Sequence, residues 1–264
     1  NDLRVLTINI WNRQGPWEQR KERLRRGIAD LKPDIVGMQE VIRRGSSNQA
    51  HELVEGHHVA FGKARPLDPD ADYGNALTSR FPILNERVVA LPCLDVDEPR
   101  SVLIVDLDTP AGVLPVLVTH YSWRLDHGYV REAQSLRIAE VLDEIPADTL
   151  PPLLLGDLNA APSEPEIEFL AGKRTLDGRT VALTDCFASA GQGEGYTFDG
   201  RHNPFAAPWN EPPRRIDYIF VDGPDAQGQG TPITADVVLD EPVDGVHPSD
   251  HYGVMAQIRI RPAP

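Results

Sequence analysis

The stretch from Leu153 to Asn159 limits the folds open to this chain more than any other segment. Three consecutive leucines after two prolines predict a short strand that is buried on both faces, and the glycine that follows permits a turn. Asp157 and Asn159 then stand at the end of that strand, where both can face one point outside the carboxyl edge of a sheet. Turn chemistry is the alternative interpretation, because Asp and Asn also bond their own backbone in tight turns.

Further segments repeat this arrangement along the chain. Apolar, strand-like runs cover residues 5–9, 35–40, 116–120 and 215–220, and each carries a polar residue at or near its end. A polar segment, Pro248-Ser249-Asp250-His251, completes the series. The polar residues of the four runs are Asn9, Glu40, His120 and Asp217.

In this order, the segments resemble the motif set of the endonuclease/exonuclease/phosphatase superfamily, the DNase I-like metal-dependent phosphoesterases. The resemblance extends from residue 5 to residue 251 and so covers nearly the whole chain. An isolated Ser-Asp-His would be a weak signal, whereas six motifs in order are specific. The resemblance implies an α/β fold, a four-layer sandwich of two mixed β-sheets packed face to face, with helices on the outer faces and the active site at one end.

Length and composition agree with a single domain over residues 1–264. A chain of 264 residues with 41% hydrophobic residues can bury a sizeable core without disulfides or metals to support it. Strands and helices alternate, and residues 101–119 read as a hairpin around Thr109-Pro110-Ala111-Gly112, which is typical of an α/β protein.

Two long amphipathic helices are expected. The first begins at Glu18 and ends before Pro33, and its basic residues 20–26 are interleaved with acids, as on a solvated helix face. The second covers residues 128–145, with Arg131 expected on its outward side. Arg131 and Gln134 resemble an Arg-x-x-Gln motif of several superfamily branches, which would pin this helix to the site.

The sequence says little about compartment. Cys93 and Cys186 lack the spacing of a metal or redox motif. A buried free thiol is expected at Cys186, and a disulfide between the two cysteines is the alternative. No apolar run approaches the ~20 residues of a membrane span. The chain starts with Asn, so removal of a start or leader is expected, and the lack of a disulfide framework favours the cytoplasm.

The resemblance implies that a metal ion assists the attack of water on a phosphoester. Oxygen ligands without cysteine suit Mg²⁺ or Mn²⁺. Glu40 is expected to be the main metal carboxylate, with Asn9 and Asp250 contributing directly or through water. One or two metal ions would fit these residues.

The remaining polar residues are expected to act on the water and the phosphate. Asp157 would orient and deprotonate the water, Asn159 would hold the nucleophile or a phosphoryl oxygen, and His120 would be a phosphate donor. His251 would contact the phosphate with its ring fixed by Asp217, because neighbours such as Asp250 point the opposite way on an extended chain. His251 stays the alternative to Asp157 as the general base.

Aromatic residues in loops indicate the substrate. The four tryptophans, Trp11, Trp17, Trp123 and Trp209, fall in predicted loops beside site strands, together with Phe205. They are expected to form a rim for a flat or greasy leaving group, although loop indoles also cap cores. The residues expected to bind substrate are Tyr121, Trp123, Arg124 and Trp209.

The expected activity is a Mg²⁺-dependent phosphodiesterase that acts on a small or lipid-like substrate, similar to a sphingomyelinase. A net charge of −14 opposes non-specific nucleic-acid binding, so nucleic acid is a less favoured partner than a compact phosphoester.

Three alternatives remain. An endonuclease, exonuclease or DNA-end phosphodiesterase would use the same residues and add basic and stacking contacts along a groove. Tyr196-Thr197-Phe198-Asp199 resembles a motif of both the tyrosyl-DNA phosphodiesterase and the sphingomyelinase branches. A phosphomonoesterase is the second alternative. A non-catalytic binding module is least expected, because it would have lost some of the ligands that this chain retains.

Overall fold

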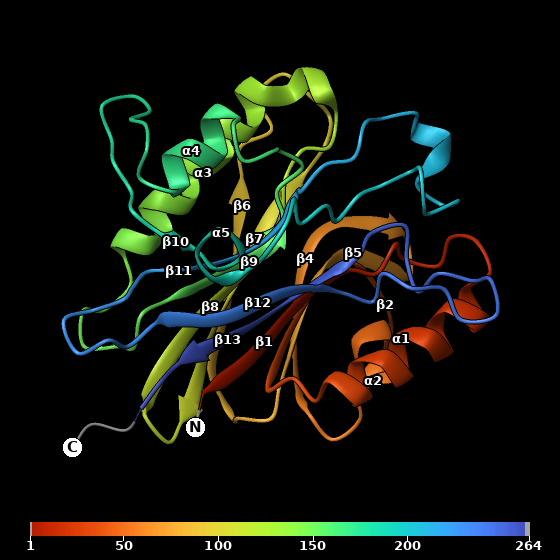
Figure 1. Ribbon diagram of the computed structural model, residues 1–264, viewed down its shortest axis with the longest axis horizontal. Coiled ribbons are helices and arrows are strands. Elements are labelled where there is room, and N and C mark those ends of the chain that lie inside the picture. Colours follow the sequence, from red (N-terminus) through yellow and green to blue (C-terminus); the bar gives the residue numbers. More distant parts are fainter. Residues whose placement is uncertain (1, 262–264) are drawn as a thin grey trace.

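The computed structural model describes residues 2–261 as two β-sheets with helices outside them (Figure 1). The strands of the first sheet are, in order across it, β12 (Thr231–Val238), β13 (Gly253–Arg259), β1 (Leu3–Asn9), β2 (Ile35–Arg44), β5 (Ala71–Ser79) and β4 (His58–Asp68), with β3 (Ser47–Asn48) paired to β2. The second sheet has the order β10 (Thr184–Asp185), β11 (Asp217–Val221), β9 (Leu153–Asp157), β8 (Gly112–His120), β7 (Arg100–Thr109) and β6 (Ile83–Leu91).

Both sheets are mixed. The pairs β1/β2 and β8/β9 are parallel, whereas neighbours such as β1/β13 and β11/β9 are antiparallel. The helices are α1 (Trp17–Leu31), α2 (Gln49–Leu53), α3 (Gly128–Asp143), α4 (Pro165–Leu170) and α5 (Cys186–Ala190), with 3₁₀ turns η1 (Leu125–His127) and η2 (Ala207–Trp209). In Figure 1, α1 and α2 lie at the lower right, α3 and α4 lie at the upper left, and strands run between the two pairs.

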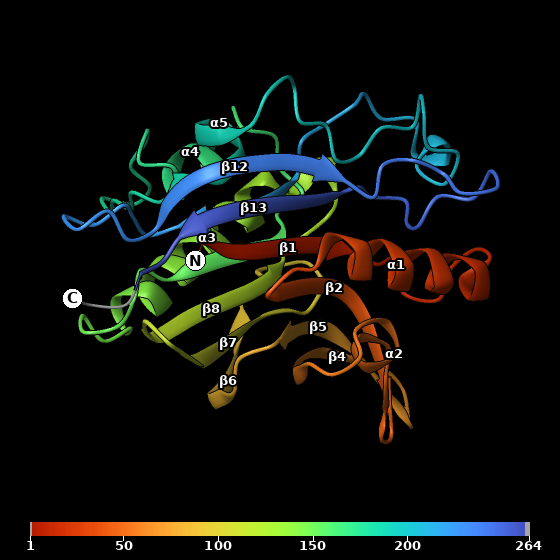
Figure 2. The ribbon, with the colours of Figure 1, turned by 60° about the horizontal axis from the view of Figure 1, so that its bottom comes forward.

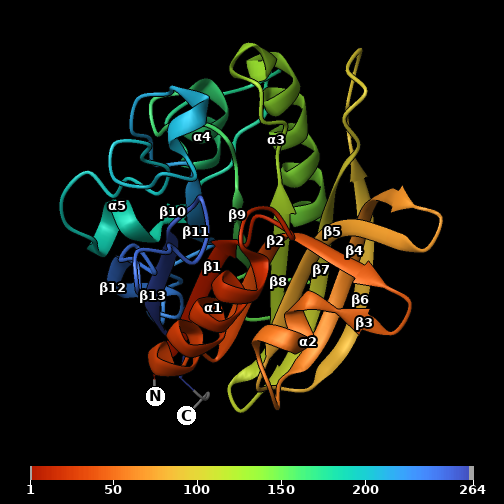
Figure 3. The ribbon, with the colours of Figure 1, turned by 90° about the vertical axis from the view of Figure 1, so that its right-hand side faces the viewer.

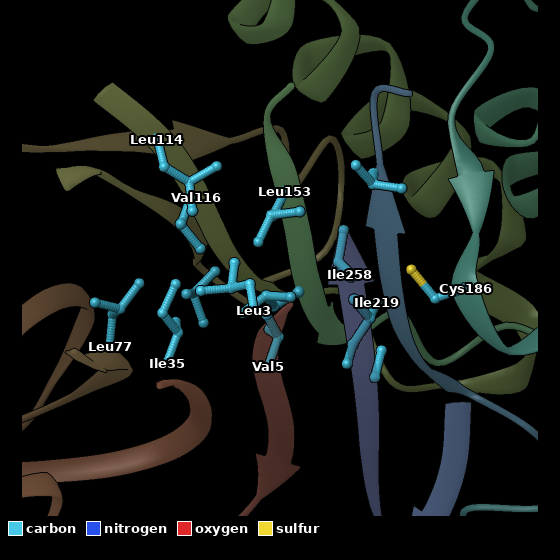
Figure 4. Packing of buried hydrophobic residues seen from close by; sticks show 14 of the residues in the cluster. Leu3, Val5, Ile35, Leu77, Leu114, Val116, Leu153, Cys186, Ile219 and Ile258 are labelled. Carbon is cyan, nitrogen blue, oxygen red and sulfur yellow. The ribbon is translucent and has the colours of Figure 1, made fainter. Parts of the chain in front are cut away.

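The apolar residues form three buried layers. The central layer lies between the sheets; Leu3 and Val5 of β1 meet Leu153 and Val116 there (Figure 4). Outside it, Leu154 of β9 packs in a layer with residues of α3 and α4, and Leu6 and Ile8 of β1 pack with residues of α1 and α2.

β9 therefore carries leucines into two layers, as its sequence predicts. Because neighbouring side chains on a strand point to opposite faces, Leu153 and Leu155 enter the central layer and Leu154 the outer one. Burial of each leucine stabilises the fold by about 1.5–3 kcal/mol. The expected four-layer sandwich is confirmed.

Loops from distant parts of the sequence gather at one end of the sandwich. In Figures 1 and 2 the loops around residues 200–212 and 240–248, coloured cyan and blue, lie at the right together with the start of α1. Figure 3 turns this side of the molecule toward the viewer. Polar residues that follow strands of both sheets meet near this end.

The predicted end of the second strand is wrong. β2 continues past Glu40 to Arg44, and its pairing with β5 skips from Met38 to Val41 at a β-bulge. Glu40 has a φ of 58° in this bulge. Bulges re-aim a side chain without ending a strand, so Glu40 leaves the ladder while β2 pairs with β5 both before and after it.

Two expectations about charged helix faces are also wrong. Arg20 of α1 is fully buried, and its guanidinium donates to the carbonyl oxygens of Ile10 and Pro248 at 2.9 and 3.0 Å. Arg131 of α3 is buried and pairs with the buried Glu166 of α4. In both cases carbonyls or a carboxylate on another segment compensate for burial, which helical spacing alone does not reveal.

Other expectations are settled as well. Trp17 begins α1 and packs in its apolar layer instead of joining a rim. Cys93 and Cys186 are both free, so the open question of a disulfide is answered, and Cys186 is buried as expected. Within residues 2–261, no helix combines the length and the apolar character that crossing a membrane requires.

Candidate active site

Strand register brings the predicted residues together. His120 ends β8 and Asp217 begins β11, and each stands directly opposite Asp157 of β9 between them. Asn9 ends β1 in the other sheet, yet its side-chain amide donates to Asp157 Oδ2 at 3.0 Å. The site therefore joins the ends of the two sheets.

Glu40 and Asp250 form the carboxylate side of the site. Two amides hold Glu40: Asn9 Nδ2 donates to Oε1 at 3.2 Å and Asn12 Nδ2 donates to Oε2 at 2.7 Å. Ser249 Oγ donates to the Asn9 carbonyl at 2.6 Å, which ties the segment before β13 to the end of β1. Burial raises the pKa of Asp250 to about 7, an effect opposed by His251 and increased by the charge of Glu40.

These residues fit a hard divalent cation. Two carboxylates lie close enough for Glu40 to oppose ionisation of the buried Asp250, and a cation would remove that repulsion. Their oxygen donors match the ligands that Mg²⁺ takes in proteins. Asn9 bridges Glu40 and Asp157 and so separates this carboxylate side from the residues around Asp157.

Asp157 is the most heavily contacted carboxylate of the site. Its Oδ1 accepts the backbone N–H of Asn159 at 3.0 Å, and Asn159 adopts the left-handed conformation (φ 51°) that closes this turn. Its Oδ2 lies 3.3 Å from His120 Nε2 and 3.6 Å from His251 Nε2. Burial raises the pKa of Asp157 to about 6 despite the opposing charge of His251.

The predicted pairing of His251 with Asp217 is present. His251 Nδ1 lies 2.9 Å from Asp217 Oδ2, so a Nδ1–H donates to the carboxylate. Burial lowers the pKa of His251, but Asp217 and Asp157 outweigh this and hold the pKa well above its ordinary value. The ring of Phe198 packs 5.0 Å from the imidazole. Asp217 thus fixes the ring of His251 and favours its charged form.

His120 has the opposite environment. Arg100 NH1 lies 2.9 Å from His120 Nδ1, and burial together with this cation lowers the pKa of His120 well below its ordinary value. The pKa values of the two histidines that face Asp157 are therefore shifted in opposite directions.

A second possible metal site is formed by three residues already described. Asp157, Asp217 and His251 each place one potential ligand atom within 4.8 Å of the others. However, His251 uses Nδ1 to bond Asp217, and an imidazolium has no lone pair for a cation. Acid–base chemistry suits this trio better than metal binding.

A cavity of about 850 Å³ opens above this cluster. Its wall includes Trp11, whose ring is tilted against that of Phe205 with centroids 5.0 Å apart, and Trp123, which lies edge-on to Trp209 at 5.2 Å. Trp123 and Trp209 keep 41% and 49% of their surface exposed. Their position agrees with the aromatic rim expected from the sequence.

Two residues expected to bind substrate lie elsewhere. The Tyr121 ring is fully buried in the layer under α3, where its hydroxyl bonds Ser135 Oγ at 3.1 Å. Only the backbone of Tyr121 serves the site, because its carbonyl accepts Asn159 Nδ2 at 3.1 Å. Arg124 pairs with Asp126 outside the cavity wall. Both residues follow His120, but the structure places neither side chain in the cavity wall: the Tyr121 ring enters the core and Arg124 pairs with Asp126.

Several cavity residues were not predicted. They include Arg100, Glu98, Asn12 and Arg214. A signal for Arg100 was available, because the predicted hairpin pairs the start of β7 with the end of β8, where His120 stands. Asn12 and Arg214 lie in loops, whose sequences carry no such pairing information.

Helix α3 is attached to the loop that follows His120. Gln134 Oε1 accepts the backbone N–H of Ser122 at 3.0 Å, and Arg131 NH1 donates to the Arg124 carbonyl at 2.7 Å. The Arg-x-x-Gln residues thus pin the helix to this loop.

Fold and site together define a phosphoesterase of the DNase I-like type. The chain belongs to the endonuclease/exonuclease/phosphatase family, whose family model matches residues 6–251. It is accordingly a hydrolase of phosphoric ester bonds. No curated protein matches the chain in sequence.

Solved structures of this fold resemble the chain over nearly its whole length. An endonuclease/exonuclease/phosphatase from Beutenbergia cavernae DSM 12333 is 27% identical, with a TM-score of 0.73 over 98% of this chain and 72% of that one. One from Bacteroides vulgatus is 21% identical, with a TM-score of 0.77 over 99% and 100%. TDP2 of D. rerio, complexed with a single-strand DNA product, is 19% identical, with a TM-score of 0.78 over 98% and 99%.

Proposed function

We propose that this chain is a Mg²⁺-dependent phosphodiesterase that acts on a compact, lipid-like phosphodiester with an apolar leaving group. The observation that carries the proposal is one cavity that holds both a carboxylate–imidazole cluster and an aromatic wall. Its volume of about 850 Å³ falls in the usual range for small-molecule sites, ~300–1,000 Å³.

Glu40 and Asp250 would hold the cation, with Asn9 contributing directly or through water. A bound Mg²⁺ neutralises phosphoryl oxygens and makes a coordinated water more acidic. Asn9 and Asn12 keep Glu40 in place through its two oxygens. The side chains that bind the cation are therefore oriented before the substrate arrives.

Asp157 would take the proton from the attacking water. Its raised pKa, about 6, lies near the range that favours a general base at neutral pH. The raised pKa of His251 favours its protonated form, which suits stabilisation of the phosphoryl charge and not proton abstraction. Between the two candidates for the base, this difference in charge favours Asp157.

The basic residues of the molecule favour a compact substrate over a long nucleic acid. All five cations of α1 are engaged within the chain, including Arg20 with carbonyls and Arg25 and Arg26 with Glu22. In the cavity wall, Arg100 pairs with Glu98 and Arg214 pairs with Glu211. These pairs reduce the positive charge that α1, Arg100 and Arg214 offer to successive phosphates.

A DNA-end phosphodiesterase is the second candidate. It is favoured by the likeness to TDP2 of D. rerio, which is complexed with a single-strand DNA product. The same metal and acid–base residues would serve this substrate, and the tryptophan wall would stack against bases.

An activity screen distinguishes these candidates. The purified chain is assayed on sphingomyelin, bis-p-nitrophenyl phosphate, inositol phosphates, plasmid DNA and an oligonucleotide with a blocked 5′ end, with Mg²⁺ and with EDTA. The expected result is metal-dependent cleavage of the lipid or another compact diester, with a KM that changes little with salt. An oligonucleotide as best substrate, with affinity falling ~10³-fold or more over a few-fold rise in salt, would favour the nuclease class.

A further inference from the structure

We propose that Arg100 is a positioning residue that fixes His120 as one neutral tautomer, with its proton on Nε2. His120 would then be a neutral hydrogen-bond donor to the phosphoryl group and would transfer no proton in the reaction. This inference rests on the proposed function only in taking a phosphoryl group as the acceptor of the hydrogen bond. The tautomer of His120 itself follows from contacts within the chain.

The tautomer follows from the donors and acceptors involved. A guanidinium has only N–H donors, so His120 Nδ1, 2.9 Å from Arg100 NH1, must present its lone pair. The single proton of a neutral imidazole then sits on Nε2, the atom that faces Asp157 Oδ2 at 3.3 Å. The partner of His251 is instead a carboxylate, which only accepts, so His251 carries its proton on Nδ1.

Burial strengthens the preference for a neutral ring. Arg100 is 7% exposed and His120 4%, so water screens the interaction between them weakly. A second proton on His120 would place an imidazolium N–H against the guanidinium, and both like charge and a lost hydrogen bond oppose this. The lowered pKa of His120 agrees with this geometry.

Glu98 holds Arg100 in the orientation that the interaction needs. Glu98 Oε1 accepts from Arg100 Nε at 3.1 Å and also from NH2, which leaves NH1 for His120. Ser122 Oγ donates to the other oxygen of Glu98. Glu98 lies in the segment before β7 and Ser122 in the segment after β8. The two segments at the open end of this hairpin therefore hold the guanidinium in place.

The two histidines therefore have different roles around one oxygen of Asp157. The imidazolium of His251 and the neutral imidazole of His120 lie 3.6 and 3.3 Å from Asp157 Oδ2. One positively charged histidine beside Asp157 stabilises a phosphoryl anion, whereas a second one would lower the pKa of Asp157 and make it a weaker base. Arg100 thus keeps the site from acquiring the second charge.

Nitrogen NMR tests the tautomer without any assay of activity. Long-range ¹H–¹⁵N spectra at neutral pH, with His120→Gln used to assign the signal among the 8 histidines, should reveal an unprotonated Nδ1 and a protonated Nε2. In Arg100→Met the same ring should become a tautomer mixture or an imidazolium. A wild-type His120 protonated on Nδ1, or on both nitrogens, would overturn the proposal. This test holds even if the substrate class is wrong.

Kinetics test the role of the neutral donor. Glutamine keeps an N–H donor near the Nε2 position but cannot shuttle a proton, so His120→Gln should stay within ~10-fold of the wild-type kcat while His120→Ala loses ~10²–10³-fold. Equal losses in the two variants, with both folded by circular dichroism, would assign proton transfer to His120 and contradict the proposal.

A double-mutant cycle tests the link to Arg100. In the wild-type background, Arg100→Met should lower kcat with little change in KM. In the His120→Gln background the same substitution should lower kcat much less, because glutamine has no tautomer to fix. Arg87→Met, which removes an exposed arginine paired with Glu144, is the matched control and should cost little in either background. The same loss for Arg100→Met in both backgrounds would separate Arg100 from His120 and overturn its positioning role.

Discussion

Single side chains decide the chemistry at Asp157. Asp157→Asn keeps the size of the side chain but removes the proton acceptor, so we expect kcat to fall by at least ~10²-fold while Mg²⁺ binding is retained. Glu40→Gln is the comparison, because it should weaken Mg²⁺ binding first. Titration of the rate with Mg²⁺ separates the two effects. The reverse pattern would exchange the roles assigned to these carboxylates.

At the residue scale, we expect His251 and Asp217 to act as one unit. Their 2.9 Å hydrogen bond aims the imidazolium and supports its charge. We therefore expect His251→Ala and Asp217→Ala each to lower kcat severely, and the double variant to be little worse than either one. The measurement is kcat in all four variants of the cycle. Additive losses would mean that Asp217 acts apart from His251.

At the scale of elements, a buried ion pair joins α3 to α4. Arg131→Met would leave the fully buried carboxylate of Glu166 without its partner, so we expect a loss of about 3–5 kcal/mol in unfolding free energy. The control, Arg174→Met, opens the exposed pair with Glu168 and should cost about 0–1 kcal/mol. Urea unfolding measures both. Equal losses would mean that α3 does not depend on this pair.

At the same scale, we expect the loops that carry Trp123 and Trp209 to recognise the leaving group. The two rings contact each other at the cavity, so Trp123→Ala should raise KM for an apolar diester several-fold with a smaller effect on kcat. Arg26→Ala on the exposed face of α1 serves as the control and should leave KM unchanged. A larger effect of Arg26 than of Trp123 would indicate a polyanionic substrate instead.

At the scale of the whole molecule, the site joins the ends of two sheets, and on the side of the first sheet the charge of Glu40 opposes ionisation of Asp250. Removal of the metal by EDTA and dialysis should abolish turnover, and Mg²⁺ should restore it. A cation that binds only the folded state should also raise stability, by about 2.7 kcal/mol at a hundredfold excess over Kd. Thermal unfolding with and without Mg²⁺ measures this shift. Turnover that persists in excess EDTA would contradict the metal-dependent mechanism.

Strand patterns predicted an α/β fold and the polar strand ends of the site, whereas the four-layer sandwich and the roles of the site residues came from the family resemblance. The leucines of β9 indicated two covered faces, and polar residues after apolar runs indicated where Asn9, Asp157 and His120 would meet. The ends of the parallel strands β8 and β9 lie at the same edge, which brings His120 beside Asp157, whereas Asn9 reaches Asp157 from the other sheet.

Pairings between distant segments were decided only by the tertiary structure. Arg20 and Arg131 have the spacing of exposed residues, but carbonyls and Glu166 compensate for their burial. Tyr121 follows His120 directly, yet its ring enters the core because the chain turns after β8. The sequence by itself determined which residue types reach the active-site end, since that follows from strand period and burial. Which way each side chain points, and which charge Arg100 imposes on His120, depends on partners that no local pattern specifies.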